Sequence, residues 1–161
     1  MISPAQHAVL DRLTAALADL PFAWAVTGST GMALQGVPLD VHDIDLQTSA
    51  AGAYAIGERL AAFAVTPVRE KISPHIRSHL GAFVVDGLIV EVLGGVQKRI
   101  DGVWEAPVDV DVHRRGVSLE GRTVPVLSLA YEERAYRALG RIERADLLRD
   151  WLQGRPQTPG S

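Results

Sequence analysis

Two aspartates separated by one residue could bind a metal ion. Asp43 and Asp45 flank Ile44 in an apolar stretch that is typical of a β-strand. Because alternate side chains of a strand point to the same face, both carboxylates would lie on one side of it and close together. Carboxylate oxygens are ligands that suit Mg²⁺. The spacing therefore predicts a magnesium site.

A glycine–serine turn precedes these acids. Gly28 and Ser29 follow an apolar strand that ends with Trp24–Thr27, and Thr30–Gln35 can form a short helix that Gly36 ends. Backbone N–H groups and the helix dipole favour an anion at such a helix start, and the serine hydroxyl is a further donor. A phosphate site beside a magnesium site indicates a nucleotide.

A looser copy of this pattern occurs later in the chain. Gly94–Gly95 is followed, after as many intervening residues, by Asp109 and Asp111. The intervening run holds Asp101–Gly102 and alternates as a hairpin does, so no helix start is expected there. Asp109, Asp111 and His113 would share a strand face and form a competing metal site, although alternation with valines also describes an exposed strand. The first copy is preferred.

Glu91 is a third carboxylate in an unusual setting. Its neighbours in the predicted strand Leu88–Leu93 are all apolar, and the Asp86–Gly87 turn places it opposite Ala82 in a hairpin. A carboxylate is costly to bury unless a cation or a hydrogen-bond donor compensates it. Glu91 is therefore a candidate third acid for two-metal chemistry. The alternative is an edge strand whose glutamate points to water.

Together these segments resemble the DNA polymerase beta-type nucleotidyltransferases. The pattern of that family is hydrophobic–Gly–Gly/Ser, a spacer, Asp–hydrophobic–Asp/Glu and a later acid on a strand. The matching segments are Val26–Ser29, Asp43–Leu46 and Val90–Val92. In size the chain is similar to small bacterial members, among them lincosamide nucleotidyltransferases and the minimal nucleotidyltransferases of toxin–antitoxin systems. Gly140–Arg141 and Asp146 resemble the carboxyl-terminal part of such proteins.

The resemblance implies a function for each site residue. Gly28 and Ser29 would hold the β- and γ-phosphates of a nucleoside triphosphate such as ATP, with Thr30 assisting. Glu91 would accept or orient the proton of an acceptor hydroxyl while pyrophosphate leaves. The implied Mg²⁺ ligands are Asp43, Asp45 and Glu91. The predicted activity is Mg²⁺-dependent transfer of a nucleoside monophosphate to a hydroxyl of a small molecule or a protein.

Two departures from the family pattern leave other functions open. The third acid is Glu91 where many members have aspartate, and Thr30–Gly31 replaces the bulky residue common in antibiotic-modifying enzymes. The main alternative is a catalytically inactive module that binds nucleotide or, like an antitoxin, a protein partner. A metal-dependent hydrolase built on the same acids is a third interpretation, but it leaves the glycine–serine turn unused.

Arg77 is the basic residue predicted to contact phosphate. It alternates with His75 and His79 along an expected strand, so the three could share a face. The hairpin register opposes this for His79 unless Gly81 forms a bulge. Further basic candidates are Lys71, Lys98 and Arg99. The tryptophans expected to pack in the core are Trp24, Trp104 and Trp151.

Hydrophobic periodicity predicts the elements that position these residues. Helices are expected at 4–19, 50–63, 128–139 and 141–152, besides the short helix after Gly28, and the expected N-caps of the first three are Ser3, Ser49 and Ser128. Strands are expected at 22–27, 43–48, 65–72, 75–85, 88–93, 108–112, 117–119 and 123–126. The predicted fold class is α/β (α+β), a nucleotidyltransferase fold with a mixed sheet, helices on one face and two C-terminal helices. A single domain would span 1–153, followed by a flexible tail at 154–161.

Composition narrows the function further. The 161 residues carry a net charge of −3 and no cysteine, and 47% are hydrophobic. One globular core is therefore expected, and disulfides, cysteine-based zinc sites and thiol nucleophiles are excluded. A nucleic-acid partner is not favoured by the acidic balance. Without a signal sequence or a long apolar run, a cytoplasmic protein with no membrane partner is predicted.

Overall fold

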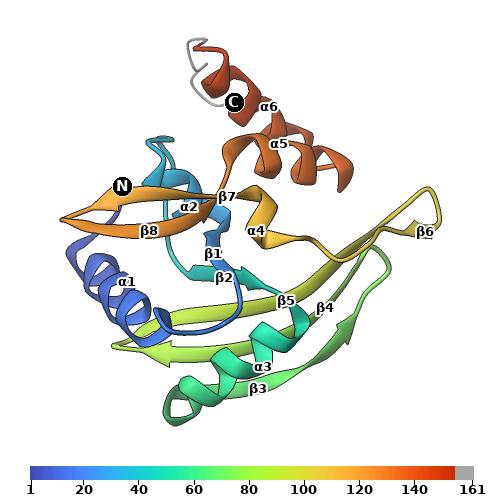
Figure 1. Ribbon diagram of the computed structural model, residues 1–161. Coiled ribbons are helices and arrows are strands. Elements are labelled where there is room, and N and C mark those ends of the chain that lie inside the picture. Colours follow the sequence, from blue (N-terminus) through green and yellow to red (C-terminus); the bar gives the residue numbers. More distant parts are fainter. Residues whose placement is uncertain (155–161) are drawn as a thin grey trace.

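A mixed β-sheet organises residues 1–154, the part of the chain that the computed structural model describes (Figure 1). The strands are β1 (Trp24–Thr27), β2 (Ile44–Thr48), β3 (Ala64–Ile72), β4 (Ile76–Val85), β5 (Leu88–Ile100), β6 (Val103–Trp104), β7 (Arg114–Leu119) and β8 (Arg122–Leu127). They lie in the order β3–β4–β5–β2–β1–β8–β7, and β6 pairs with the far end of β5. Strands β1 and β8 are parallel, as are β2 and β5, whereas the other pairs are antiparallel.

Helices cover both faces of this sheet. They are α1 (Pro4–Leu17), α2 (Gly28–Leu34), α3 (Ala50–Arg59), α4 (Val110–His113), α5 (Leu129–Ala138) and α6 (Ile142–Leu152), with a 3-10 turn η1 (Ala61–Phe63). Val26 of β1 packs in the core with α1 and α3, whereas the adjacent Ala25 packs with Val110 of α4 and Tyr131 of α5. Successive strand residues point to opposite faces. The predicted mixed sheet flanked by helices is therefore confirmed, but the placement of helices on one face is wrong.

Three serines begin helices where the sequence predicts a helix start. Ser3 forms a capping box with Gln6 ahead of α1, Ser49 accepts a hydrogen bond from the Gly52 N–H ahead of α3, and Ser128 accepts one from the Tyr131 N–H ahead of α5. Each cap satisfies a backbone donor that the first helical turn leaves unpaired.

The hairpin of β4 and β5 has the predicted register. The Asp86–Gly87 turn brings Val85 opposite Leu88 and Ala82 opposite Glu91. Strand β5 lies between β4 and β2, so the edge-strand alternative for Glu91 is wrong.

Strand β5 runs further than predicted because a bulge lets it continue past the glycines. Gly95 has a φ of +59°, and the pairing with β4 shifts by one residue beside it. Leu93 before the bulge and Val96 and Lys98 after it consequently line the same cavity. Gly94 allows close packing, since a Cβ there would lie 2.5 Å from the carbonyl oxygen of Ser49.

The strand expected at 108–112 is wrong, because these residues lead into the short helix α4. Asp109 caps it by accepting a hydrogen bond from the Asp111 N–H at 3.1 Å, and the Asp111 carboxylate lies 3.0 Å from the Arg114 guanidinium. This local hydrogen bond competes with strand pairing. The strand face that Asp109, Asp111 and His113 would have shared therefore does not form, neither as the competing metal site nor as the preferred exposed strand.

Trp104 does not pack in the core as predicted. Its half-buried ring lies on the β5–β6 hairpin, with the guanidinium carbons of Arg77 and Arg99 at 4.8 Å and 5.9 Å from the ring centroid. Trp24 is buried, and Trp151 packs beside the Met32–Leu148 cluster. Of the predicted tail, only Gly154 belongs to the described residues.

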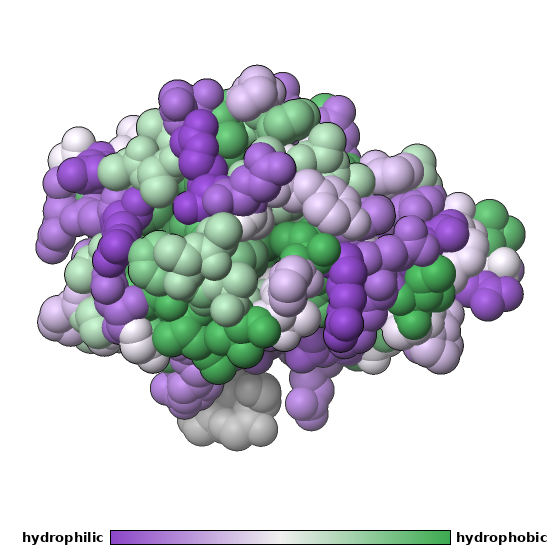
Figure 2. All heavy atoms as spheres, turned by 90° about the horizontal axis from the view of Figure 1, so that it is seen from below, coloured by the Kyte–Doolittle hydropathy of each residue, from purple (hydrophilic) through white to green (hydrophobic). Residues whose placement is uncertain are grey.

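The side of the molecule that carries α3 and β3 has a mixed surface. Figure 2 shows hydrophobic patches interspersed with hydrophilic residues on this side. Val65 and Ile72 of β3 are among the large apolar side chains that are more than half exposed. Within residues 1–154, the helices are all too short or too polar to cross a membrane.

Candidate functional site

A row of residues runs across the centre of the sheet. Thr27 at the end of β1 pairs with Asp45 on β2, and Asp45 pairs in turn with Glu91 on β5. Paired residues on adjacent strands share a face and lie about 5 Å apart. Asp43 occupies the bend before β2. Burial, then the nearby charges of Glu91 and Asp43, raises the pKa of Asp45 to about 6. The three predicted acids therefore lie close together.

The glycine turn lies directly against Asp45. Gly28 begins α2 with a φ of +67°, and a Cβ on it would approach the Asp45 Oδ2 to 2.9 Å. Only glycine combines this backbone conformation with such a close approach. Ser29 is half-buried, and its hydroxyl makes no hydrogen bond within residues 1–154. The turn thus presents an unpaired donor beside the carboxylates, as predicted for a phosphate site.

Thr30 has a different position from the one predicted. Its buried hydroxyl donates a hydrogen bond of 2.7 Å to the Asp43 carbonyl oxygen. The hydroxyl therefore holds the bend that carries Asp43, and its hydrogen is not available to a phosphate. The unusual Gly31 also has a structural reason, because a Cβ there would lie 2.8 Å from the Val26 carbonyl oxygen. This glycine allows α2 to pack closely on β1.

Arg77 lies apart from the row of acids. Ile76 and Lys98 are paired and both line the cavity described below, so Arg77, paired with Gln97, points to the opposite face. There its guanidinium stacks on Trp104. His79 is on that face as well, and its Nδ1 lies 2.8 Å from the Tyr54 hydroxyl.

Glu132 is a site residue that sequence reasoning missed. This α5 glutamate is only 4% exposed, and its Oε1 accepts hydrogen bonds from the Thr27 hydroxyl at 2.5 Å and the Gly28 N–H at 3.2 Å. Burial raises its pKa to about 7, although these hydrogen bonds oppose the shift. A signal was present, since Leu129, Glu132 and Tyr136 share one helical stripe and the acid interrupts its apolar character.

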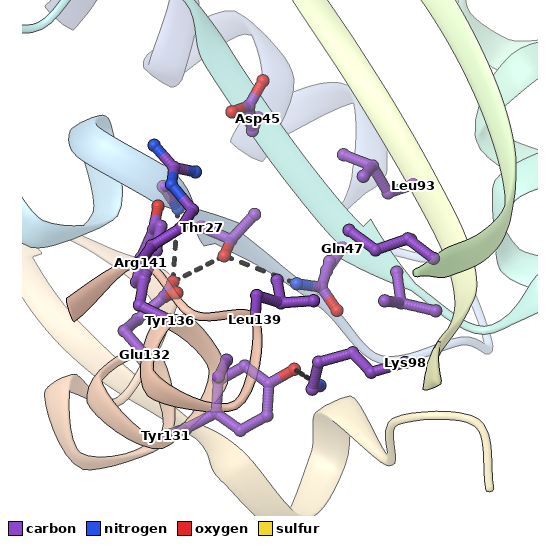
Figure 3. Close-up of a pocket in the computed structure, with 14 residues that line it drawn as sticks. Thr27, Asp45, Gln47, Leu93, Lys98, Tyr131, Glu132, Tyr136, Leu139 and Arg141 are labelled. Atoms are coloured by element: carbon purple, nitrogen blue, oxygen red, sulfur yellow. Dashed lines mark hydrogen bonds between the residues drawn. The ribbon is translucent and has the colours of Figure 1, made fainter. Parts of the chain in front are cut away.

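A cavity of about 170 Å³ lies between the sheet and α5 (Figure 3). Thr27, Gly28 and Asp45 form one end of it, and the side chains of Gln47 and Lys98 line it further along. The remaining lining residues are Ile76, Leu93, Val96, Tyr131, Glu132, Ala135, Tyr136, Leu139 and Arg141. The cavity is thus mostly apolar, with a few buried polar groups, as is common for small-molecule sites.

Glu91 borders a different space. It lines an open groove of about 520 Å³ over β3 and β4, together with Thr66, Arg69, Lys71, Leu80 and Ala82. Arg69 and Lys71 pair with Leu80 and Ser78 of β4, and neither has an ion-pair partner in the described part of the chain. The row of acids therefore separates an enclosed cavity from an open, partly basic groove.

The residues that resemble the carboxyl-terminal family segment lie in two places. Arg141 lines the cavity, and its guanidinium stacks on Tyr136 at 4.8 Å. Asp146 is instead bound by Arg137 and Arg149 at 3.1 Å and 3.2 Å on the surface of the two last helices. Only Arg141 therefore contributes to the site.

Comparison with known protein families identifies the chain. A family model described as aminoglycoside-2''-adenylyltransferase matches residues 9–150. The chain belongs to the aminoglycoside-2''-adenylyltransferase family. The resemblance to small nucleotidyltransferases is thereby confirmed, and the family assignment makes the chain a nucleotidyltransferase. A comparison with curated proteins found no match.

Solved structures of nucleotidyltransferases share this fold. A crystal structure of a candidate nucleotidyltransferase from Thermotoga maritima is 45% identical, covers 96% of this chain and 97% of its own, and superposes with a TM-score of 0.84. The crystal structure of ANT(2'')-Ia in complex with adenylyl-2''-tobramycin gives a TM-score of 0.57 at 14% identity, covering 91% and 89% of the two chains. Lincomycin-bound lincosamide adenylyltransferase LnuA gives 0.53 at 10% identity, covering 92% and 97%. The last two show likeness of fold.

The carboxylates of this family member fit a magnesium ion that substrate phosphates help to hold. Within residues 1–154, no three His, Asp or Glu side chains converge closely enough to bind a metal by themselves. Mg²⁺ is usually bound by one or two carboxylates together with phosphates and water. Burial is the main reason for the raised pKa of Asp45, and the repulsion from Glu91 and Asp43 that adds to it is of the kind a cation would relieve. Asp43 and Asp45 are therefore suited to bind it jointly with a nucleotide.

Proposed function

We propose that this protein catalyses Mg²⁺-dependent transfer of a nucleoside monophosphate from a nucleoside triphosphate to a hydroxyl group of a small molecule or a protein. The observation that carries the proposal is the row formed by the Gly28 turn, Asp45 and Glu91 on neighbouring strands. This row supports the proposal because a phosphate donor, a metal ligand and a proton acceptor would be needed in this order.

The triphosphate would bind at the Gly28–Ser29 turn. The Gly28 N–H is already bound by Glu132, so the donors for the β- and γ-phosphates would be the N–H groups that follow in α2 and the Ser29 hydroxyl, which makes no hydrogen bond within residues 1–154. Asp43 and Asp45, with Glu91 completing the set once substrate is present, would hold Mg²⁺. When bound, the ion would neutralise phosphate charge as pyrophosphate leaves. Thr30 supports this arrangement by fixing the bend at Asp43.

Glu91 is the proposed general base. The acceptor hydroxyl would approach from the groove that Glu91 lines and transfer its proton to this carboxylate. The acceptor oxygen forms a bond to the α-phosphorus as the bond from that phosphorus to pyrophosphate breaks. The product is the acceptor carrying the nucleoside monophosphate, and the second product is pyrophosphate.

The named relatives support an acceptor with a hydroxyl group. ANT(2'')-Ia was solved with adenylyl-2''-tobramycin, in which an acceptor carries an adenylyl group, and LnuA was solved with lincomycin. Both point to ATP as a donor worth testing first for this chain. The open groove beside Glu91 leaves room for a small molecule or for a protein side chain.

Calorimetric titration of ATP, GTP, CTP and UTP with and without Mg²⁺ tests the proposal. We expect Mg²⁺-dependent binding that Asp45→Asn weakens by about tenfold or more, because a charge-assisted metal contact is lost. Asp111→Asn is the matched control, since Asp111 belongs to the second Asp–x–Asp pair and is engaged by Arg114. Pyrophosphate release with a panel of hydroxyl compounds that includes tobramycin and lincomycin then measures turnover.

The same titration can contradict the proposal. If the folded wild-type protein bound none of the four nucleotides in the presence of Mg²⁺, the nucleotidyl-transfer proposal would fail. The alternative of a catalytically inactive interaction module would then be preferred. Equal losses of nucleotide affinity in Asp45→Asn and Asp111→Asn would also refute the assignment of the metal ligands.

A further inference from the structure

We infer that the cavity between the sheet and α5 is the nucleobase site, and that Gln47 makes it prefer bases with an exocyclic amino group over uracil. This inference rests on the proposed function, because it names the part of the nucleotide that the cavity would hold. The inference is based on side-chain groups in the cavity wall whose hydrogen bonding is incomplete within residues 1–154.

Gln47 presents an unused acceptor to the cavity. The side chain is only 8% exposed, and its Oε1 has no hydrogen-bond partner within residues 1–154. Its Nε2 lies 3.5 Å from the Thr27 hydroxyl oxygen. A buried polar atom without a partner is rare in proteins and costs stability. A group that donates a hydrogen bond into the cavity would satisfy it.

The orientation of the Gln47 amide is fixed by Glu132 through Thr27. The Thr27 hydroxyl has one hydrogen and donates it to Glu132 at 2.5 Å. It can therefore only accept from Gln47, so the amide –NH₂ points to Thr27 and the amide oxygen points to the cavity. Figure 3 shows this chain of three side chains along the cavity wall. The second amide hydrogen serves Tyr131, because a side-chain hydrogen bond from Gln47 partly opposes the rise in the pKa of that phenol. The cavity is therefore offered the Gln47 oxygen as an acceptor.

Lys98 presents an underused donor nearby. It is 6% exposed, and its Nζ lies 3.5 Å from the Tyr131 hydroxyl and 4.0 Å from Glu105, both at the outer limit of such contacts. Burial lowers the pKa of this amine, although the carboxylates of Glu105 and Glu132 oppose the shift. The ammonium has three hydrogens to donate, so a ligand acceptor would complete its shell.

A nucleobase combines the features that these walls require. It is flat and largely apolar on its faces, which suits the aliphatic and tyrosine side chains, and its edge carries donors and acceptors. At roughly 30 Å³ of liquid volume for a water molecule, the cavity holds about six waters, enough for one small ring system. An exocyclic amino group could donate to Gln47 while a ring nitrogen or carbonyl accepts from Lys98. Uracil has no amino group, so it cannot match Gln47 in this way.

The position of the cavity favours the nucleotide over the acceptor. Gly28 and Asp45, the proposed phosphate and metal residues, lie at one end of the cavity, whereas the proposed base Glu91 lines the separate groove. A triphosphate at the turn therefore has its nucleoside next to the cavity. The acceptor hydroxyl must reach Glu91 and would use the groove.

Affinities measured with Mg²⁺ for ATP, GTP, CTP, UTP and inorganic triphosphate test the inference. In the wild type we expect the three amino-bearing nucleotides to bind about tenfold or more tightly than UTP. Gln47→Leu should bring their affinities to within about threefold of that for UTP and leave triphosphate affinity unchanged. Thr27→Val should weaken the preference for amino-bearing bases, because the Gln47 amide can then rotate and exchange the positions of its oxygen and nitrogen.

Lys98→Met supplies a second signature. Every base has an acceptor for Lys98. This variant should therefore lower the affinity for all four nucleotides about equally and leave the affinity for inorganic triphosphate unchanged. Gln97→Leu is the control, since Gln97 lies on the opposite face of the sheet. It should leave the base preference as it is in the wild type.

Several outcomes would overturn the inference. Equal binding of UTP and the other nucleotides by the wild type, with triphosphate also bound, would reject the base preference and leave the proposed function standing. A loss of triphosphate affinity in Gln47→Leu or Lys98→Met would mean that these residues support the phosphate site or the fold. If neither triphosphate nor any nucleotide bound to the folded wild type, both proposals would fail.

Discussion

The cavity and the groove on the two sides of the acid row differ in how closely the protein surrounds them. Helix α5 covers the cavity, and hydrogen bonds fix the orientation of buried polar groups in its wall. The groove is open, larger and bordered by the unpaired cations Arg69 and Lys71 on the edge strand β3. An enclosed site with fixed donors and acceptors can select one ring, whereas an open surface accepts varied partners. Under the proposed assignment of the two spaces, we therefore expect stronger selection of the donor nucleotide than of the acceptor.

The largest effect is expected from Glu91→Gln, which separates chemistry from nucleotide binding. Removing a general base should slow nucleotidyl transfer by about 100- to 10,000-fold. Nucleotide affinity should fall far less than the rate, because Asp43 and Asp45 would still hold Mg²⁺ and Glu91 lines the groove and not the cavity. Single-turnover transfer from α-labelled ATP and calorimetry measure the two quantities. Glu70→Gln on β3 is the control, and a loss of affinity equal to the loss of rate would remove the division between the two spaces.

Glu132→Gln should abolish the pH dependence of stability that the ionisation of Glu132, beside the cavity, causes. The folded-state pKa of Glu132 is raised to about 7 from 4.5, so the folded protein holds this proton more tightly than the unfolded chain. Its contribution to stability is therefore present below pH 4.5 and is lost as the pH rises through 7, by about 3 kcal/mol. Urea unfolding between pH 5 and 8 measures this free energy.

The glutamine variant keeps an acceptor for Thr27 and Gly28 but does not ionise. Its unfolding free energy should fall less than that of the wild type over the same pH range. Glu143→Gln, an exposed change on α6, should follow the wild type. Parallel profiles for wild type and Glu132→Gln would show that burial of Glu132 does not oppose its ionisation.

Gly28→Ala should damage the contact between the turn and Asp45. A left-handed φ costs a non-glycine residue about 1–2 kcal/mol, and here the added Cβ also meets Asp45 at 2.9 Å. Gly121→Ala in the β7–β8 hairpin has a similar φ of +80° with no atom within 4 Å of the new Cβ. Thermal unfolding should show a lower stability of both variants than of the wild type. Nucleotide affinity should fall only in Gly28→Ala, and an unaffected affinity would argue against a phosphate site at this turn.

The smallest effect is expected from neutralising the groove. The double variant Arg69→Gln/Lys71→Gln should alter ATP affinity less than about threefold and stability by about 0.5 kcal/mol or less, as is usual for exposed side chains. Calorimetry with ATP and Mg²⁺ checks the first value. A large loss of ATP affinity would place the triphosphate over the groove and reverse the assignment of the two spaces.

Local sequence patterns predicted most of the elements and the centre of the site. The caps at Ser3, Ser49 and Ser128 and the Asp86–Gly87 turn depend on nearby residues, and all four formed as expected. Strand alternation and hairpin register predicted the faces of the acids, but Asp45 and Glu91 meet through the parallel pairing of β2 with β5, which joins distant segments and was expected only from the family resemblance.

What could not be predicted depends on contacts between distant segments. Glu132 is more than 100 residues from Thr27 in the chain, and only the packing of α5 on β1 brings them together. The α4 region failed for the opposite reason, because the side chain of Asp109 satisfies the backbone more simply than a strand partner would. The position of Arg77 was a failure to extend a local rule, since the hairpin register that sets His79 on the face opposite Glu91 sets Arg77 there as well. Its stacking on Trp104 is a contact that the sequence does not reveal.

The bulge at Gly95 affects how related sequences should be aligned. Counting by twos from Glu91 leads to Gln97 and Arg99, but the cation that faces the cavity is Lys98. Gly95 therefore behaves as a one-residue insertion. It shifts by one the sequence positions that face the cavity after it, while their side chains still follow one another along the strand. A relative that lacks this residue can keep an equivalent lysine six positions after its acid, and an ungapped alignment would overlook it.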